Sequence, residues 1–470
     1  MLNEVDFHIP EVATKQLKVQ TVQDKRRVTL SSNLLLLAGF EGNVSQVIEE
    51  SLGEGQGFIV RLASQEEIAE GKTKKVYTRE YKSRSANPLK RKEHLIQISR
   101  QDLIDNALGK SCTHVHVTLR YGEIIFKPIK QEQFDLIQDI DSETPINTFV
   151  AMTGGVDCHV LEKSGFAISA VVEYRPQEAR DNTDYTELTS MSVLANCKPN
   201  VLFNEDIYTL DVQRIAEVLV DTPITFSMFS LQCDDFSTLK THQQRENSVA
   251  DLSSTLDMFI PMLNIIDKLK NPVVLIENVP GFQDSPINDV VRLQLMRRGF
   301  TVHQDVFDAR DYGGHTSRKR TYLVATTLKA PFEFPEKTAP APHVWPAVIE
   351  PNWDEIVKKD VTDTKVAKDS ITTNRLRAIT EDKHFAPTLT KSQGQDAKDS
   401  VVVQKDGRIY RLPVRVQKLL NGISDSFNLD WMPVDKAAQV IGQSICCNLH
   451  EAIIGSVKKH IQLSAKLATA

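Results

Sequence analysis

The chain has 470 residues, of which 41% are hydrophobic and 7% aromatic. This length favours two or three domains, and the apolar content excludes a chain that is disordered throughout. The formal net charge is −6 and the pI is about 6.1, which excludes a surface that is cationic throughout but leaves room for a local basic cleft.

The first residues show no basic segment followed by an apolar core, so we expect no signal peptide. The longest apolar run, Leu34 to Phe40, is too short to span a membrane. The six cysteines form no Cys-x-x-Cys pair and cluster with no other metal ligands. This pattern favours free thiols in a reducing cytoplasm and predicts no metal site.

Residues 1–140 differ in character from the rest of the chain. The segments HLIQIS, THVHVTL and GEIIFKPI predict strands of a small β-rich accessory module. Between Lys72 and Lys92 there are nine basic residues and one acid, Glu80. Such a stretch fits phosphate contacts and equally a solvated loop, so DNA binding by this module is one of two open interpretations.

From about Thr148 onward, short apolar runs alternate with helical stretches. The expected strands are INTFVAM, AISAVVEY, ITFSMFS, VVLIEN and TYLVAT, with helices expected over Ser253–Lys270 and Pro286–Arg298. Strands that are apolar almost throughout and separated by helices predict an α/β fold with a doubly wound, mostly parallel sheet. In such sheets ligands bind at the carboxyl ends of the strands. We therefore expect a ligand-binding domain over residues 145–326.

A proline-rich and then mixed-charge segment, Thr326–Ala386, breaks this alternation. It predicts a separate region over residues 327–410 rather than a continuation of the sheet. Residues 411–470 follow, with a helix over RLPVRVQKLL and a final helix from about Asn448.

Three strand ends carry residues suited to a nucleotide-like ligand. Thr153-Gly154-Gly155 is a glycine turn leading into a helix, where the backbone can approach a ligand closely, although many such turns are only tight turns. Glu173 could accept hydrogen bonds from ribose hydroxyls, and Asp206 could receive an adenine amino group. Each acid fits a solvated strand end equally well.

Further residues at strand ends suit nucleophilic chemistry. Cys233 follows the strand ITFSMFS and lies beside two acids, whereas a structural cysteine is usually buried among apolar groups. Glu277 ends the strand VVLIEN. Arg318 and Arg320 alternate, so their side chains share one face of a strand; alone, they would fit a solvated edge.

Taken in order, these segments resemble the motifs of the DNA cytosine-5 methyltransferases. They are GGVD, VVEY, EDI, LQCDDFS, IENVPGF, DYGGHTSRKRTYLVA, RLPVRVQKLLNGISDSF and QVIGQSICCNLHEAI. The resemblance covers about Thr148 to Val457, or about two thirds of the chain. Each motif alone is weak, and it is their order that makes the resemblance specific.

The resemblance implies that the Cys233 thiolate adds to carbon 6 of a flipped cytosine while Glu277 protonates ring nitrogen 3. Carbon 5 then takes the methyl group of S-adenosylmethionine, and Arg318 and Arg320 help to hold the ring. Residues 327–410 would be the target-recognition region, and part of 411–470 would return to the catalytic domain. The donor-binding residues implied are Phe149, Thr153, Gly154, Gly155, Glu173, Tyr174, Asp206, Ile207, Gln443 and Ser444. The implied partners are double-stranded DNA and S-adenosylmethionine, with a cognate restriction enzyme left open.

The sequence departs from the family pattern in five places. Gln232 stands where the family has proline, Asp234 where it has glutamine, Thr316 where it has glutamine and Gln443 where it has asparagine. The glycine loop also lacks a further glycine that the family has near Met152. A carboxylate at Asp234 disfavours the neighbouring thiolate. Two other functions therefore stay open: a transfer RNA cytosine-5 methyltransferase, and a catalytically idle relative that only binds DNA.

Overall fold

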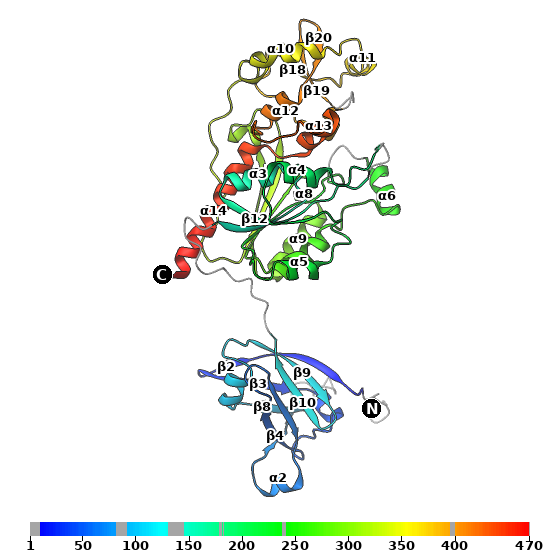
Figure 1. The fold of residues 1–470 in the computed structure, drawn as a ribbon. Helices are drawn as coiled ribbons and strands as arrows, with labels where there is room; N and C mark the ends of the chain where they lie inside the picture. The colour runs from blue at the N-terminus through cyan, green and yellow to red at the C-terminus, as the bar shows by residue number, and fades with distance from the viewer. Residues whose placement is uncertain are drawn as a thin grey trace. The chain divides into compact units, whose positions relative to one another are not determined.

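A computed structural model describes residues 10–80, 92–129, 145–177, 181, 183–236, 241–394 and 400–469. The chain divides into two compact units, residues 1–133 and 134–470, and each is described by itself (Figure 1). Within the described ranges, no helix combines the length and the hydropathy that a membrane crossing requires.

The N-terminal unit is built from antiparallel strands. A six-stranded sheet has the order β1-β9-β10-β5-β4-β6, and a four-stranded sheet has the order β2-β3-β8-β7. Alternate residues of the strands point into a common core, where the rings of Phe58 and Phe126 stack with their centroids 4.7 Å apart. The elements are β1 (Ala13–Lys18), β2 (Gln20–Val22), β3 (Lys25–Ser31), α1 (Leu34–Leu37), β4 (Gln46–Ser51), β5 (Phe58–Leu62), α2 (Gln65–Ala69), β6 (Lys74–Lys75), β7 (Tyr77–Glu80), β8 (Lys92–Ile98), the π-helical turn η3 (Leu103–Ala107), β9 (His114–Arg120) and β10 (Glu123–Pro128).

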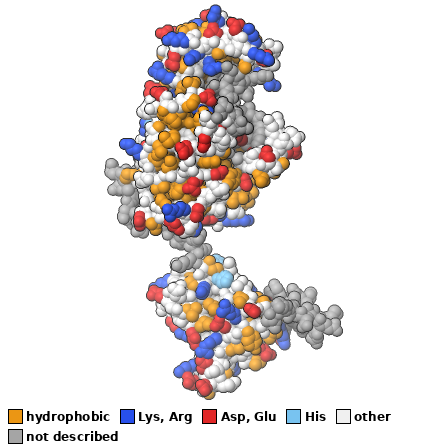
Figure 2. Space-filling view, turned by 45° about the vertical axis from the view of Figure 1, so that its right-hand side comes forward, with side chains coloured by type: hydrophobic (Ala, Val, Ile, Leu, Met, Phe, Trp, Pro, Cys, Tyr) orange, Lys and Arg blue, Asp and Glu red, His pale blue; other side chains and the backbone are white. Residues whose placement is uncertain are grey.

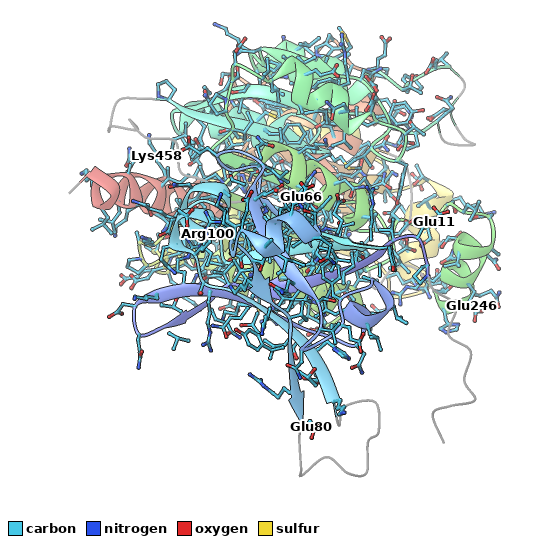
Figure 3. All side chains as sticks on the ribbon, turned by 90° about the horizontal axis from the view of Figure 1, so that it is seen from below. Glu11, Glu66, Glu80, Arg100, Glu246 and Lys458 are labelled. Atoms are coloured by element: carbon cyan, nitrogen blue, oxygen red, sulfur yellow. The ribbon has the colours of Figure 1, made fainter. Side chains whose placement is uncertain are left out.

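The basic stretch predicted between Lys72 and Lys92 lies only partly in the described residues, because residues 81–91 fall outside them. Its ends are the paired strands β7 and β8, with Glu80 at the far end of β7 (Figure 3). There the Lys92 ammonium lies 3.3 Å from the Glu80 carboxylate. Both side chains are well exposed, so this ion pair contributes little to stability.

The second unit is organised around a seven-stranded sheet of order β13-β12-β11-β14-β15-β17-β16. All neighbouring strands are parallel except β17, which runs antiparallel to both β15 and β16. This architecture confirms the predicted doubly wound α/β fold. The strands are β11 (Ile146–Ala151), β12 (Phe166–Val172), β13 (Val201–Phe203), β14 (Phe226–Ser230), β15 (Val273–Asn278), β16 (Thr301–Asp308) and β17 (Lys319–Thr326).

Helices cover both faces of this sheet, which explains why its strands are apolar almost throughout (Figure 1). Along β11, Phe149 packs into one core and Val150 into the other. The first core takes side chains from α5, α7 and α9, and the second takes them from α3 and α14. The helices of this part are α3 (Val156–Lys163), α4 (Leu188–Asn196), α5 (Val212–Val218), α6 (His242–Ala250), α7 (Phe259–Leu269), α8 (Pro280–Gln283), α9 (Pro286–Arg297), the 3-10 turn η4 (Ala309–Tyr312) and α14 (Cys447–Thr469).

The element boundaries differ from the sequence prediction in three places. Strands β13 and β16 were not predicted, β13 because it has only three residues. The helix predicted from Ser253 begins only at Phe259, because the preceding residues turn to bond the Asp235 carboxylate, which accepts the Thr255 backbone N–H at 2.7 Å. Arg318 lies one residue before β17, not within the strand.

A smaller region with a three-stranded sheet follows β17, and acidic and basic side chains are interspersed over its surface (Figure 2). We call residues 344–411 the small-sheet region; in Figure 1 it carries the labels β18, β19 and β20. Its elements are η5 (Trp345–Ile349), η6 (Glu350–Asn352), α10 (Trp353–Ile356), η7 (Val357–Lys359), α11 (Lys365–Thr372), β18 (Arg377–Ile379), η8 (Lys391–Gly394), β19 (Val401–Lys405) and β20 (Arg408–Arg411). The helices α12 (Val414–Leu420) and α13 (Val434–Gln443) then lead to α14.

Between β18 and β19 the chain leaves the small sheet and returns toward the seven-stranded sheet; we call residues 386–391 the crossing segment. Ala386 pairs with Thr316 in a parallel bridge just before β17. The crossing segment then passes over the end of α13 at Gly442, where an added Cβ would lie 1.9 Å from the Thr390 carbonyl oxygen. Only glycine allows this approach, because the atom in the way is backbone and cannot rotate aside.

We predict that Gly442→Ala lowers the free energy of unfolding by about 1–3 kcal/mol, because the new methyl group overpacks against the crossing segment. Chemical denaturation measures this. The matched control is Gly455→Ala in the exposed face of α14, where an added Cβ meets nothing within 4 Å. There alanine should be neutral or stabilising by up to about 1 kcal/mol. Equal effects of the two substitutions would contradict the close crossing.

Candidate functional site

A cavity of about 460 Å³ lies at the carboxyl ends of the parallel strands. Eight of the ten predicted donor-binding residues line it: Thr153, Gly154, Glu173, Tyr174, Asp206, Ile207, Gln443 and Ser444. The lining thus brings together the ends of β11, β12 and β13 with the end of α13, which lies far away in the sequence.

Phe149 and Gly155 are not among the lining residues. Phe149 is fully buried, and its ring centroid lies 5.9 Å from that of Phe229 in the core. Gly155 instead allows α3 to approach α4, since an added Cβ would lie 3.2 Å from the Val193 backbone nitrogen. The structure therefore places these two residues behind the cavity wall.

The glycine turn and Glu173 hold each other in place. The Thr153 and Gly154 backbone N–H groups donate to Glu173 Oε1 at 2.6 and 2.8 Å, and the Thr153 hydroxyl donates to it at 3.2 Å. Burial raises the pKa of Glu173 to about 7, against the lowering effect of these hydrogen bonds. Gly154 has φ +65° and an added Cβ there would meet open space, so the turn leaves room for a ligand.

Cys233 lies in the loop that follows β14, and this loop is fixed by its neighbour Asp235. The buried Asp235 carboxylate accepts hydrogen bonds from the Ser254 hydroxyl at 3.1 Å and from the Thr255 N–H and hydroxyl. Gln232 and Asp234, on either side of Cys233, both line the cavity. Residues 237–240 of the same loop lie outside the described residues.

Glu277 is the last residue but one of β15, the strand next to β14, and its buried carboxylate has two partners. The Ser230 hydroxyl donates to Oε2 at 2.6 Å, and Arg320 Nε lies 2.7 Å from Oε1. The following residue, Asn278, donates from its side-chain amide to the Leu231 carbonyl oxygen at 3.2 Å. These contacts tie together the ends of three adjacent strands, β14, β15 and β17.

Arg318 is 1% exposed and does not pair with Glu277. Its guanidinium donates to three backbone carbonyl oxygens, those of Leu389 at 3.0 Å, Gly442 at 3.3 Å and Gln443 at 3.1 Å. Burial lowers the pKa of this arginine, and the three carbonyls stabilise its protonated form. Arg318 thereby joins the crossing segment and the end of α13 to the start of β17, and of the two arginines it is Arg320 that contacts Glu277.

Sequence reasoning missed four charged residues that line the cavity: Asp157, Arg175, Glu205 and Lys391. Asp157 could have been found, because it follows the glycine turn by two residues and so falls in the first turn of α3. Lys391 had no such signal, since the crossing segment brings it to the cavity from the small-sheet region.

A family model described as C-5 cytosine-specific DNA methylase matches residues 203–459. The chain is 34% identical over 115 residues to the Type II methyltransferase M.MspI of Moraxella sp., an alignment that covers 24% of this chain and 25% of that protein. The chain thus spans about a quarter of the length of this curated relative.

Two solved structures are similar in fold. The methyltransferase EhMeth of Entamoeba histolytica has a TM-score of 0.52 at 15% identity, covering 67% of this chain and 98% of that one. The Dnmt2 methyltransferase of S. pombe has a TM-score of 0.51 at 15% identity, covering 66% and 97%. Because the family model spans more than half of the sequence, this chain belongs to the C-5 cytosine-specific DNA methylase family.

Proposed function

We propose that this protein transfers a methyl group from S-adenosylmethionine to carbon 5 of cytosine in double-stranded DNA. The observation that carries the proposal is the position of Cys233 and Glu277 after the neighbouring parallel strands β14 and β15, beside the cavity at the same edge of the sheet. The family membership supports the reaction, and the description of the family supports DNA as the substrate.

The cavity fits the proposed donor. Gly154 leaves open space at the turn, Glu173 offers a carboxylate for the ribose hydroxyls, and Asp206 is available for the adenine amino group. Gln443 and Ser444 close the opposite wall. When bound, the donor would supply an electrophilic methyl group next to Cys233.

The residues of the site would divide the remaining chemistry among them. Addition of the Cys233 thiolate to carbon 6 converts the cytosine ring into an enamine, and Glu277 supplies the proton that nitrogen 3 takes up. Carbon 5 then accepts the methyl group, with S-adenosylhomocysteine as the leaving group. Loss of the carbon 5 proton to solvent, departure of the thiolate and return of the nitrogen 3 proton to Glu277 restore the ring and the acid. Ser230 and Arg320 orient the Glu277 carboxyl group for this role.

The target base must leave the helix to reach Cys233, since both faces of a stacked base are covered. We propose that the small-sheet region reads the surrounding sequence, because it is joined to the catalytic part through the crossing segment. The proposal for the N-terminal unit is that the basic stretch between Lys72 and Lys92 contacts nucleic-acid phosphates.

We predict that the wild-type protein forms 5-methylcytosine in duplex DNA and that Cys233→Ala reduces transfer below about a thousandth of that rate, because the ring is no longer activated. Mass spectrometry of nucleosides measures the product after incubation with S-adenosylmethionine. Bulk transfer RNA is assayed in parallel. If 5-methylcytosine forms only in transfer RNA, the substrate is transfer RNA and not DNA. If it forms in neither nucleic acid, the proposed function is contradicted.

We predict that Glu277→Gln lowers the rate of transfer about 10²–10⁴-fold, because the amide cannot supply a proton to nitrogen 3. Binding of S-adenosylmethionine, measured by calorimetry, should be retained, since Glu277 does not line the cavity. A variant nearly as fast as the wild type would exclude Glu277 as the acid.

Burial raises the pKa of Cys233; the nearby Arg320 opposes this shift, and the carboxylates of Asp234 and Glu277 add to it. Removing one carboxylate should lower this pKa. We therefore predict that Asp234→Asn moves the pH dependence of Cys233 alkylation by iodoacetamide to lower pH. Peptide mass spectrometry measures the fraction of alkylated Cys233 between about pH 7 and pH 10, and this fraction reports how much of the thiol is ionised. Asp221→Asn, at an exposed and distant site, is the matched control. Superimposable curves for all three proteins would show that Asp234 does not influence the thiol.

A further inference from the structure

One buried carboxyl group in the cavity wall has no role in the chemistry described so far. Asp157 lies in the first turn of α3, is 2% exposed and lines the cavity beside the glycine turn. Among the described residues, its Oδ1 has no hydrogen-bond partner. Burying a carboxyl group without a partner costs free energy, and native proteins keep such groups mainly where they serve a ligand.

His450 on α14 is the nearest candidate for a structural partner, but it does not neutralise Asp157. Its Nε2 lies 3.7 Å from Asp157 Oδ1, beyond hydrogen-bond distance, and the opposite ring nitrogen lies 3.2 Å from the Tyr322 hydroxyl. The histidine is fully buried, and burial lowers its pKa to about 3, so the ring is neutral at physiological pH. The imidazole therefore offers no counter-charge to an ionised Asp157, and among the described residues its Nε2, like Asp157 Oδ1, has no hydrogen-bond partner.

The rest of the cavity lining favours a cationic ligand. Five acidic side chains line it, against two basic ones: Asp157, Glu173, Glu205, Asp206 and Asp234, against Arg175 and Lys391. Arg175 already pairs with Asp181, with its Nη1 2.6 Å from a carboxylate oxygen. Burial and the nearby Glu277 carboxylate raise the pKa of Asp157 well above its usual range, so an incoming cation would be what stabilises its ionised form.

We infer that Asp157 is a donor-binding residue whose carboxylate pairs with a cationic group of S-adenosylmethionine. This rests on the proposed function. The donor carries two such groups, an ammonium and a sulfonium, and a charge-assisted hydrogen bond or ion pair to either is strongest in a buried site of this kind. Because the product S-adenosylhomocysteine keeps the ammonium but loses the sulfonium charge, the two groups can be told apart.

Calorimetric titration of the full-length protein with S-adenosylmethionine and with S-adenosylhomocysteine tests the inference. Asp157→Asn keeps the shape and removes the charge; it should weaken S-adenosylmethionine binding about tenfold or more. An equal loss for S-adenosylhomocysteine assigns the contact to the ammonium, and retained binding of S-adenosylhomocysteine assigns it to the sulfonium. His450→Gln is the matched variant, since it alters the neighbour of Asp157 but leaves the carboxyl group, and it should change binding less than about threefold.

Two results would overturn the inference: Asp157→Asn binding both ligands like the wild type, or His450→Gln losing as much affinity as Asp157→Asn. The second result would mean that Asp157 affects ligand binding only by positioning α14, not by contacting the ligand. Thermal unfolding verifies that each variant is folded, and Asp157→Ser replaces the asparagine variant if that one is not. If the wild-type protein transfers methyl groups and Asp157→Asn binds S-adenosylmethionine as tightly as the wild type, this inference is refuted but the proposed function is not. Wild-type protein that binds no S-adenosylmethionine would refute the proposed function together with it.

Discussion

The buried guanidinium of Arg318 is the interaction on which the site depends. Removing a charged group from water is costly, and here the cost is offset by hydrogen bonds to three backbone carbonyl oxygens. Those carbonyls belong to the crossing segment and to the end of α13, so Nη1 and Nη2 of Arg318 both find acceptors only when the two segments are in place; its Nε has no hydrogen-bond partner among the described residues. The wall of the cavity formed by Gln443 and Ser444 therefore assembles together with the start of β17, which also carries Arg320.

The chemistry of the site follows from this assembly. β17 runs antiparallel to β15, so its first residues lie beside the last residues of β15, and Arg320 meets Glu277 there. Ser230 at the end of β14 completes the contact with the same carboxylate. The cavity at this edge of the sheet is lined by the same Ser230 and is rich in acids. Two buried carboxyl groups thus differ in their surroundings: Glu277 has a cationic partner, whereas Asp157 Oδ1 has no hydrogen-bond partner among the described residues.

Much of the catalytic part could be predicted from the sequence, because its strands are apolar on both faces and its motifs follow in a specific order. That logic located Glu173 and Glu277 at strand ends. Sequence reasoning failed where the position of a side chain depends on segments that are distant in the sequence. It grouped Arg318 with Arg320, whereas the Arg318 guanidinium donates hydrogen bonds to the carbonyl oxygens of residues 389, 442 and 443. Sequence reasoning also placed Phe149 and Gly155 in the cavity wall. A motif does not reveal which side of a strand or a turn faces the hydrophobic core. Lys391 reaches the cavity through a crossing that no local pattern encodes.

The crossing segment also constrains how such a protein could change specificity during evolution. The small sheet is made from β18 before the crossing and from β19 and β20 after it, so the chain interrupts this sheet to pass over Gly442. Recombination that replaced residues 344–411 as a single cassette would also replace the carbonyl of Leu389 and the backbone that fits against Gly442. A successful exchange would have to retain residues 386–391 and join new sequence on both sides of them.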